Sequence, residues 1–318
     1  MLNRIVSYLP GQNISASASG ARRRLCLSLA AGAALMPMPA RLLAHTASRP
    51  RIACIDWAAA ESLAWLGHMP VAVPDLAVYR QWLPEPPLPR NTIDLGSRGE
   101  PNLELLASLN LDRILVSSWQ AGMLPLFLKI APAEAAVVFD SRREPYANIR
   151  LLLIRMGRMT GREHAAHACL AVFDDEMERL RGALDDVAHP SVYIAVLHEN
   201  GAQAFVYGHG SWVDAVVRRL GLRNAWTART SFYGNSLIGI SELAAVPDAM
   251  ILYLDQGGRT DRAEALLRDS TLWHSLPAVA AKRVAKIPSF YALGGMASAL
   301  RCARLVADAA LAMRKRAR

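Results

Sequence analysis

The chain is poor in cysteine and has no paired cysteine spacing. Its 318 residues include four cysteines, at positions 26, 54, 169 and 302. None of them forms a CxxC pair or a zinc-ribbon pattern, so the sequence indicates neither a structural metal nor a disulfide framework. We expect Cys54, Cys169 and Cys302 to be free thiols, and the sequence leaves open a single disulfide among them.

Enzyme signatures are also missing. The chain contains no GxSxG elbow, no GxxxxGK[ST] loop, no GxGxxG turn and no HExxH motif. His164 and His167 lie at i, i+3 spacing, but no carboxylate or third histidine accompanies them at a readable spacing, so we interpret them as a surface pair. The motifs therefore identify no catalytic residue and no protein-held metal, although their absence does not exclude an enzyme.

Acidic residues are absent from the first 44 positions, which contain Arg22-Arg23-Arg24. An apolar run follows these arginines to about Met38, and small residues stand near Ala40 and Ala44. This pattern predicts a twin-arginine export signal over residues 1–44 and a periplasmic destination. The run is interrupted too soon by proline and arginine to make a good membrane span, and no later segment reaches the length of a membrane-spanning helix.

The excess of positive charge is confined to the ends of the chain. Lysine and arginine number 36 against 27 acidic residues, but the surplus lies within residues 1–44 and in the basic tail Arg314–Arg318. Between these ends the charges balance, so the sequence predicts no nucleic-acid partner.

Strand-like and helix-like segments alternate along the rest of the chain, which favours βαβ units and mainly parallel sheets. In the first half we expect strands over 51–55, 71–73, 114–118 and 137–140, and helices over 58–66, 103–109 and 124–130. A Thr-x-x-Glu capping box at Thr160–Glu163 predicts the start of one long amphipathic helix. The second half continues with strands over 192–197, 205–207, 250–254 and 284–287, and helices over 212–220 and 296–313.

This order predicts an α/β protein of two lobes joined by one long helix. We place the first lobe at residues 45–160, the connecting helix at 161–188 and the second lobe, with its basic tail, at 189–318.

Arg98 is the residue most suggestive of ligand recognition. It follows a strand-like segment and precedes an amphipathic helix in which Pro101 suits the first turn, so we expect it on a loop at a sheet edge. The alternative is a solvated arginine or a structural ion pair.

Aromatic residues that we expect in loops or just after strands complete a candidate pocket for a bulky ligand with an anionic side. They are Trp57, Trp82, Trp119, Tyr233 and Tyr291. A turn at Gly208–Ser211 is predicted either to cap the next helix or to seat a small anion.

Several ordered segments of the chain resemble the periplasmic ferric hydroxamate siderophore-binding proteins, the FhuD family of ABC-importer receptors. The resemblance begins at Tyr79–Trp82, Glu85–Pro89 and Ile93–Leu106 and continues through Ile130–Pro132, Asn224–Trp226, Phe232–Gly234, Ser270–Pro277 and the closing helix. It implies a class III, chelatase-like binding-protein fold with a shallow aromatic cleft, and a ligand that arrives as a preformed Fe(III) chelate.

The resemblance also implies roles for single residues. Arg98 stands where the family has an arginine that hydrogen-bonds the hydroxamate oxygens, a task that a forked cationic donor performs well. Gln120 replaces the expected hydrogen-bonding tyrosine, while Tyr233 and Tyr291 stand where the family has tryptophans. The remaining implied pocket residues are Trp57, Trp82, Trp119, Phe205 and Tyr207.

Partners follow from the same resemblance. It implies a monomer that docks through Glu104 and Glu242, one carboxylate on each lobe, onto an inner-membrane ABC permease driven by a cytoplasmic ATPase. Otherwise these glutamates are solvated residues of first helical turns. Three functions remain open besides ferric hydroxamate capture: a receptor for cobalamin or haem, an exported enzyme on the same fold, and a periplasmic sensor or structural protein.

Overall fold

Five short parallel strands form the sheet of the first lobe. The computed structural model describes residues 49–185 and 191–317, which lie in one compact unit. The export signal predicted over residues 1–44 therefore lies outside the described residues. The strand order is β3-β2-β1-β4-β5, and the strands are β1 (Ile52–Cys54), β2 (Ala72–Val73), β3 (Ile93–Asp94), β4 (Arg113–Ser117) and β5 (Ala133–Ala136).

Both faces of this sheet are covered by helices, as parallel sheets require. Ile52 and Cys54 of β1 enter one core cluster and Ala53 enters another, because successive strand residues point to opposite faces. The helices are α1 (Trp57–Trp65), α2 (Leu76–Trp82), α3 (Leu103–Ser108), the 3₁₀ helix η1 (Ser118–Met123) and α4 (Leu124–Phe127).

The second lobe is built on a mixed sheet in the order β11-β10-β6-β7-β9, with β8 beside β6. Strand β7 runs antiparallel to both neighbours, and the remaining pairs are parallel. The strands are β6 (Ser191–Leu197), β7 (Gln203–Tyr207), β8 (Arg223–Asn224), β9 (Asn235–Gly239), β10 (Met250–Asp255) and β11 (Val284–Pro288). The helices are α7 (Trp212–Arg219), η2 (Ile240–Ala245), α8 (Gly258–Arg268), α9 (Thr271–Ser275), α10 (Pro277–Ala280) and α11 (Met296–Ala317).

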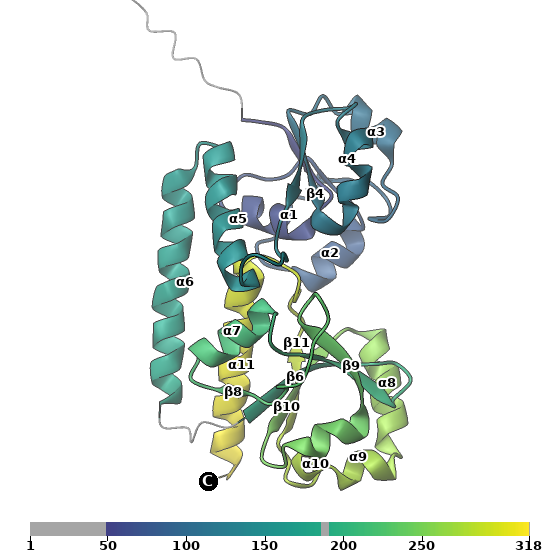
Figure 1. Ribbon diagram of the computed structural model, residues 1–318, viewed down its shortest axis with the longest axis vertical. Helices are drawn as coiled ribbons and strands as arrows, with labels where there is room; N and C mark the ends of the chain where they lie inside the picture. The colour runs from purple at the N-terminus through teal and green to yellow at the C-terminus, as the bar shows by residue number, and fades with distance from the viewer. Residues whose placement is uncertain (1–48, 186–190, 318) are drawn as a thin grey trace, which may run out of the picture. The chain divides into compact units, whose positions relative to one another are not determined.

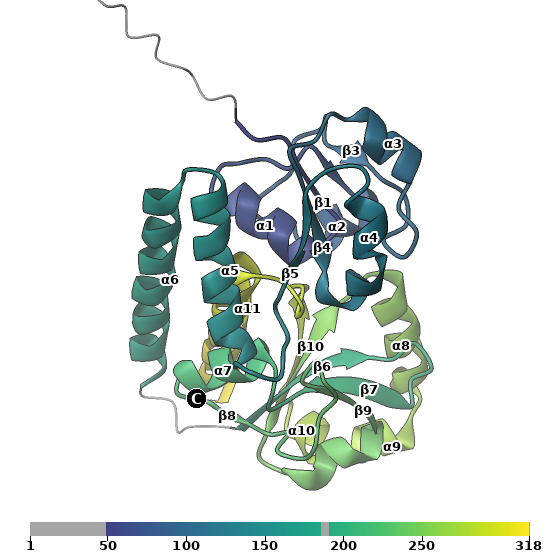
Figure 2. The same ribbon diagram turned by 45° about the horizontal axis from the view of Figure 1, so that its top comes forward.

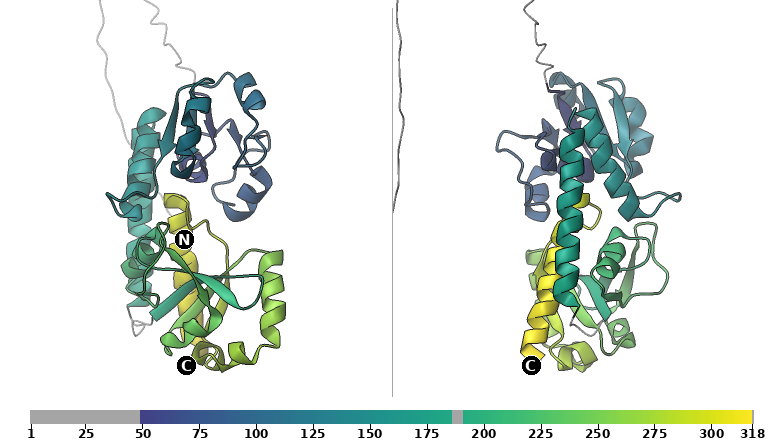
Figure 3. Two further views of the ribbon diagram at one scale, coloured as in Figure 1. Left: turned by 45° about the vertical axis from the view of Figure 1, so that its right-hand side comes forward. Right: turned by 90° about the vertical axis from the view of Figure 1, so that its left-hand side faces the viewer.

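Long helices connect the two lobes (Figures 1 and 2). Helices α5 (Pro145–Met159) and α6 (Glu163–Leu184) lie between β5 and β6 in sequence, and α6 runs beside α11 (Figure 3). A single apolar cluster includes residues of α1, α5, α6, α7 and α11. The predicted architecture of two α/β lobes joined by a long helix is confirmed, and a shared core holds the lobes together.

Three local predictions were wrong. Thr160 does not cap α6: it ends α5, where its hydroxyl donates to the Met156 carbonyl oxygen, and the N-cap of α6 is Arg162. Pro101 precedes α3, whose N-cap is Asn102. The fifth strand is Ala133–Ala136 instead of 137–140, because Val138 and Phe139 bury their side chains in the core cluster shared by the lobes.

Candidate ligand-binding cleft

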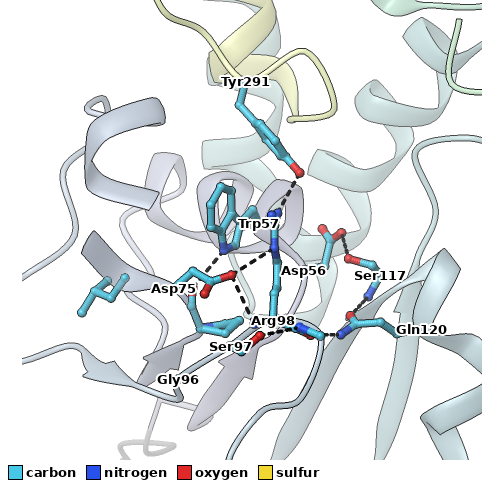
Figure 4. Close-up of polar contacts among 12 residues, drawn as sticks. Asp56, Trp57, Asp75, Gly96, Ser97, Arg98, Ser117, Gln120 and Tyr291 are labelled. Carbon is cyan, nitrogen blue, oxygen red and sulfur yellow. Dashed lines mark hydrogen bonds and ion pairs between the residues drawn. The ribbon is translucent and has the colours of Figure 1, made fainter. Parts of the chain in front are cut away.

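Arg98 lies on the loop between β3 and α3, as predicted. The loop leaves β3 through Gly96, whose φ of 77° is a left-handed conformation that glycine adopts without strain. The backbone of Arg98 is held at both ends of the residue: its N–H donates to Asp75 Oδ2 at 3.2 Å, and its carbonyl oxygen accepts from Gln120 Nε2 at 2.6 Å (Figure 4). The position of Arg98 is therefore set by two other segments of the first lobe.

The guanidinium of Arg98 is oriented by three groups. Its Cζ lies 3.7 Å from the centroid of the Trp57 ring, its Nε lies 3.5 Å from Asp75 Oδ2, and its Nη1 donates to the Tyr291 hydroxyl at 2.9 Å (Figure 4). A cation over an indole face is stabilised by about 0.5–2 kcal/mol, depending on desolvation. The side chain keeps 25% of its surface exposed, so donor groups remain available to a ligand.

Trp57 is the centre of an aromatic cluster. It is 1% exposed, and its Nε1 donates to the Pro74 carbonyl oxygen at 3.0 Å. The ring centroids of Tyr79, Trp82 and Tyr291 lie 5.6, 6.3 and 5.1 Å from that of Trp57, in edge-on or tilted geometries. We expected these tryptophans in loops or just after strands. Trp57 follows β1 and is the first residue of α1, whereas Trp82 is the last residue of α2.

A small hollow opens beside this cluster, and both lobes line it. The first lobe contributes Asp56, Ser117, Ser118, Trp119, Ala136, Val138 and Phe139, and the second contributes Tyr233, Tyr291 and Leu293. Tyr233 packs edge-on against Phe139 across the lobes, with ring centroids 5.5 Å apart. The hollow therefore combines aromatic walls with a polar floor between two lobes.

The predicted aromatic residues differ in their distance from this hollow. Trp119 stands at its edge with 53% of its surface exposed, and so presents a free indole to solvent. Phe205 and Tyr207 lie on β7, pack against the core cluster shared by the lobes and do not line the hollow. Tyr207 lies near enough to Tyr291 for the two phenols to interact, and burial raises the pKa of Tyr207.

Gln120 does not face the hollow. Its side chain is buried, its Oε1 accepts from the Ser117 N–H at 3.1 Å, and its Nε2 donates to the Arg98 carbonyl oxygen. The amide is thus used to close the first turn of η1 and to hold the Arg98 loop. The structure gives Gln120 a supporting position in place of the direct ligand contact that we expected.

Three polar residues of the site, Asp56, Asp75 and Ser117, were not predicted from the sequence. Asp75 orients Arg98, while Asp56 Oδ2 accepts from the Ser117 hydroxyl at 2.7 Å beneath the guanidinium. Burial raises the pKa of Asp56 to about 6, although Ser117, the Ala59 N–H and Arg98 oppose the shift. One available signal was the position of Asp56 directly before α1, where an acid accepts the N–H of the third helical residue.

Glu61 links the first lobe to α11 of the second. It is fully buried on α1, and its Oε2 accepts from the Gly295 N–H at 2.7 Å. A Cβ at Gly294 would lie 2.8 Å from the same oxygen, so the approach requires glycine. Burial raises the pKa of Glu61 to about 7 against the lowering effect of bonds from Ser298 and Gly295.

Glu61 is expected to make the protein less stable as pH rises. Its pKa is about 7 in the folded state against an ordinary 4.5, so between these values the unfolded chain loses the proton first. The loss of unfolding free energy from this group amounts to about 3 kcal/mol by neutral pH and is absent below about pH 4.5. Glu61→Gln is uncharged at every pH, so urea unfolding between pH 4.5 and 7.5 should show a smaller decline than in the wild type.

Asp56 provides the internal comparison for that experiment. Its pKa is raised in the same direction over a lower pH range, so part of the decline remains in Glu61→Gln. An identical pH dependence in the variant and the wild type would show that the Glu61 carboxyl is ionised in the folded state throughout this range.

The two glutamates implied in docking lie on different lobes. Glu104 is exposed in the first turn of α3, and Glu242 is exposed in η2, where its Oε1 accepts from the Gly239 N–H at 2.9 Å. Each element precedes a strand of its lobe's sheet, β4 and β10 respectively. The two carboxylates therefore occupy comparable positions in the two lobes.

The remaining candidates have simple structural roles. His164 and His167 are both exposed on α6. Ser211 caps α7 through a bond from the Asp214 N–H at 3.1 Å, which confirms the predicted turn with a serine cap. Cys54, Cys169 and Cys302 are free thiols, so the disulfide left open is not formed.

The described part of the chain has no metal-binding cluster and no membrane-spanning helix, and it also has a larger groove. Within residues 49–185 and 191–317, no three histidine, cysteine or acidic side chains are grouped to hold a metal ion. No helix in the same part of the chain is both long and apolar enough to cross a membrane. A larger groove runs between α6 and α7, beside Asp174, Arg181 and Arg218, and none of the predicted site residues lines it.

Two α/β lobes joined through a shared helical core, with a hollow lined by both of them, define the fold of a class III substrate-binding protein. The chain belongs to the periplasmic binding protein family, whose model matches residues 52–291. That family consists of substrate-binding proteins.

The chain is also similar to individual proteins and to a solved structure over most of its length. The chain is 31% identical over 294 residues to the iron(3+)-hydroxamate-binding protein FhuD of Escherichia coli, covering 91% of this chain and 96% of that protein. It is 26% identical over 246 residues to the Fe(3+) dicitrate-binding periplasmic protein FecB of the same organism, covering 75% and 77%. Among solved structures, FhuD of Vibrio cholerae bound to Fe3+-Desferal matches with a TM-score of 0.76 and 28% identity, covering 84% of this chain and 99% of that one.

Proposed function

We propose that this chain is a periplasmic receptor that captures a preformed ferric hydroxamate siderophore and delivers it to an inner-membrane ABC permease. The observation that carries the proposal is the Arg98 guanidinium, stacked on Trp57 and partly exposed beside an aromatic hollow between two lobes. Hydroxamate oxygens on Fe(III) remain electron-rich, and a guanidinium donates to them without replacing any of them on the metal. The named relatives that bind ferric hydroxamates support this choice of ligand.

In this proposal the chelate contacts Arg98 and the aromatic residues around the hollow. Trp119, Tyr233 and Tyr291 line the hollow, and Trp57 and Trp82 pack against Tyr291 behind it. Gln120 acts indirectly by holding the loop of Arg98. Phe205 and Tyr207 support this wall from β7. The protein catalyses no reaction and holds no cofactor of its own.

Delivery involves the two carboxylates. Glu104 and Glu242 dock the loaded receptor, as a monomer, onto the permease that a cytoplasmic ATPase drives, and no nucleic acid takes part. Residues 1–44 direct export through the twin-arginine route.

The test is a parallel titration of the protein with several chelates. Tryptophan fluorescence is followed while ferrioxamine, ferrichrome, ferric citrate, cobalamin and haemin are added, each with its metal-free or unrelated control. Saturable quenching by the ferric hydroxamates, with no response to the iron-free ligands, is the expected result because Trp57, Trp82 and Trp119 surround the site. If only another chelate gave saturable quenching, the protein would still be a binding protein, but its ligand would not be a ferric hydroxamate.

A further inference from the structure

Helix α11 of the second lobe begins against a carboxyl group of the first lobe. The helix starts at Met296, and the Gly295 N–H just before it donates to Glu61 Oε2 at 2.7 Å. The Ser298 hydroxyl and N–H also donate to the Glu61 carboxyl group. The first N–H groups of a helix have no partner within the helix, and an acidic side chain near them is stabilising. Glu61 therefore caps α11 from the other lobe, 234 positions away in sequence.

Two successive glycines allow α11 to approach this carboxyl group. A Cβ at Gly294 would lie 2.6 Å from Ser298 Oγ, and a Cβ at Gly295 would lie 2.8 Å from Ser62 Oγ on α1. A side chain at either position would force the surrounding atoms apart, whereas glycine fits without displacement. The sequence thus supplies both the acceptor on α1 and the small residues that let α11 reach it.

The segment directly before α11 forms the second-lobe side of the hollow. Tyr291 and Leu293 line the hollow, while Phe290 is buried in the core shared by the lobes. The Gly294 N–H donates to the Tyr291 carbonyl oxygen at 2.7 Å, which closes a turn between Tyr291 and the start of α11. A displacement of the Gly295 N–H would therefore carry the residues of this wall with it.

Glu61 also lies behind the first-lobe side of the cleft. It is fully buried on α1. Burial raises the pKa of the Tyr79 phenol, and the nearby Glu61 carboxyl group adds to this shift. The Tyr79 ring packs edge-on against Trp57, which supports the Arg98 guanidinium. One buried side chain thus connects the residues behind both walls of the cleft.

We propose that Glu61 is a positioning residue of the ligand cleft, which fixes the wall formed by Tyr291 and Leu293 against the first lobe. This inference rests on the proposed function and adds to it a residue that does not touch the ligand. Phe290 holds the segment to the shared core, and the bonds to Glu61 set its distance from α1, because hydrogen bonds are short and directional and apolar packing is not. A cleft whose walls are fixed in advance needs less ordering when a chelate binds, and so binds more tightly.

The first experiment measures ferrioxamine binding by isothermal titration calorimetry, well below the unfolding temperature of every variant. Glu61→Ala should weaken binding about 5- to 30-fold, because the ligand must then order the wall. Glu61→Gln keeps an oxygen that accepts from the Gly295 N–H, so it should bind within about 3-fold of the wild type. Leu180→Ala is the control, since it empties a buried site on α6 that does not line the hollow. It should lose stability and keep its affinity.

Hydrogen exchange in the ligand-free protein tests the position of the wall directly. The Gly295 and Ser298 amides donate to Glu61, so Glu61→Ala should speed exchange over residues 290–300 more than Leu180→Ala does. Glu61→Gln should restore most of the protection. This measurement needs no ligand. If the wild type binds none of the chelates, the proposed function has failed, and exchange still shows whether Glu61 holds the segment.

Several outcomes would overturn the inference. One is a folded Glu61→Ala variant with the affinity of the wild type. Another is an equal loss of affinity in Leu180→Ala, because the cause would then be a general loosening of the shared core. A third is a Glu61→Gln variant that binds as weakly as Glu61→Ala, since the accepting oxygen would then not be what positions the wall.

Ser298→Ala replaces Glu61→Ala if the latter does not fold. It removes one donor to the Glu61 carboxyl group from the second lobe and leaves the Gly295 N–H in place. We expect it to weaken ferrioxamine binding about 2- to 5-fold. Unchanged binding by this variant, together with unchanged exchange over residues 290–300, would contradict the positioning role.

Discussion

Replacing Arg98 with alanine is expected to weaken binding of a ferric hydroxamate by roughly 10- to 150-fold. This range corresponds to about 1.5–3 kcal/mol, the usual contribution of a hydrogen bond to a charged group. Arg98 is held by Asp75, Trp57 and Tyr291 before any ligand arrives, so little ordering is needed on binding. Calorimetric titration with ferrioxamine measures the loss directly.

The fold should survive this substitution, because the side chain is partly exposed and lies on a loop. Arg262→Ala is the matched control, since it removes a surface arginine that pairs with Glu199 on the second lobe, away from the cleft. The control should bind ferrioxamine as the wild type does. Equal affinities for Arg98→Ala and the wild type would remove Arg98 from the binding site.

Trp57→Ala is expected to reduce the free energy of unfolding by about 3–5 kcal/mol, since it empties a large buried site. The indole is 1% exposed, contacts three other aromatic rings and donates to Pro74. For a chain of this size the loss corresponds to a fall in Tm of about 5–9 °C. Thermal and urea unfolding measure the change.

Trp57→Phe separates the stabilisation that comes from filling the buried site from the stabilisation that is specific to the indole ring. It keeps an aromatic face beneath Arg98 but loses the bond to the Pro74 carbonyl oxygen, so its loss of stability should be smaller than that of alanine. If Trp57→Ala were as stable as the wild type, the buried indole would not stabilise the folded protein as we expect. Weak ligand binding in the phenylalanine variant alone would indicate that the larger indole face is needed to hold the Arg98 guanidinium in place.

Most elements were predictable because their signals are local. The runs at β1, β4 and β6 have buried apolar residues at successive positions, and the predicted ends differ from the observed ones by at most one residue. The fifth strand was misplaced because Val138 and Phe139 are as apolar as a strand, and an apolar run does not reveal which surface covers it.

The site was predictable in part. Arg98 was placed correctly because a turn glycine precedes it and an amphipathic helix follows it. The contacts of Gln120 were not predicted, because they include a carbonyl oxygen 22 residues away in sequence, which its own neighbourhood does not reveal. Asp75 was overlooked because it is an isolated acid whose partner, Arg98, becomes a neighbour only when β2 and β3 pair.

The amino-acid sequence by itself determined the alternation of strands and helices that defines the fold class and the loop position of Arg98, because side-chain periodicity and turn residues act over a few positions. It did not reveal several elements, among them α2, α5 and α8. The resemblance carried by its motifs indicated the binding-protein class. Only the tertiary structure decided that Tyr291 meets Arg98 and that Glu61 binds the start of α11, since these contacts join residues 193 and 234 positions apart. Such contacts exist only after the two sheets and the shared helical core have assembled, because no local interaction brings those residues together.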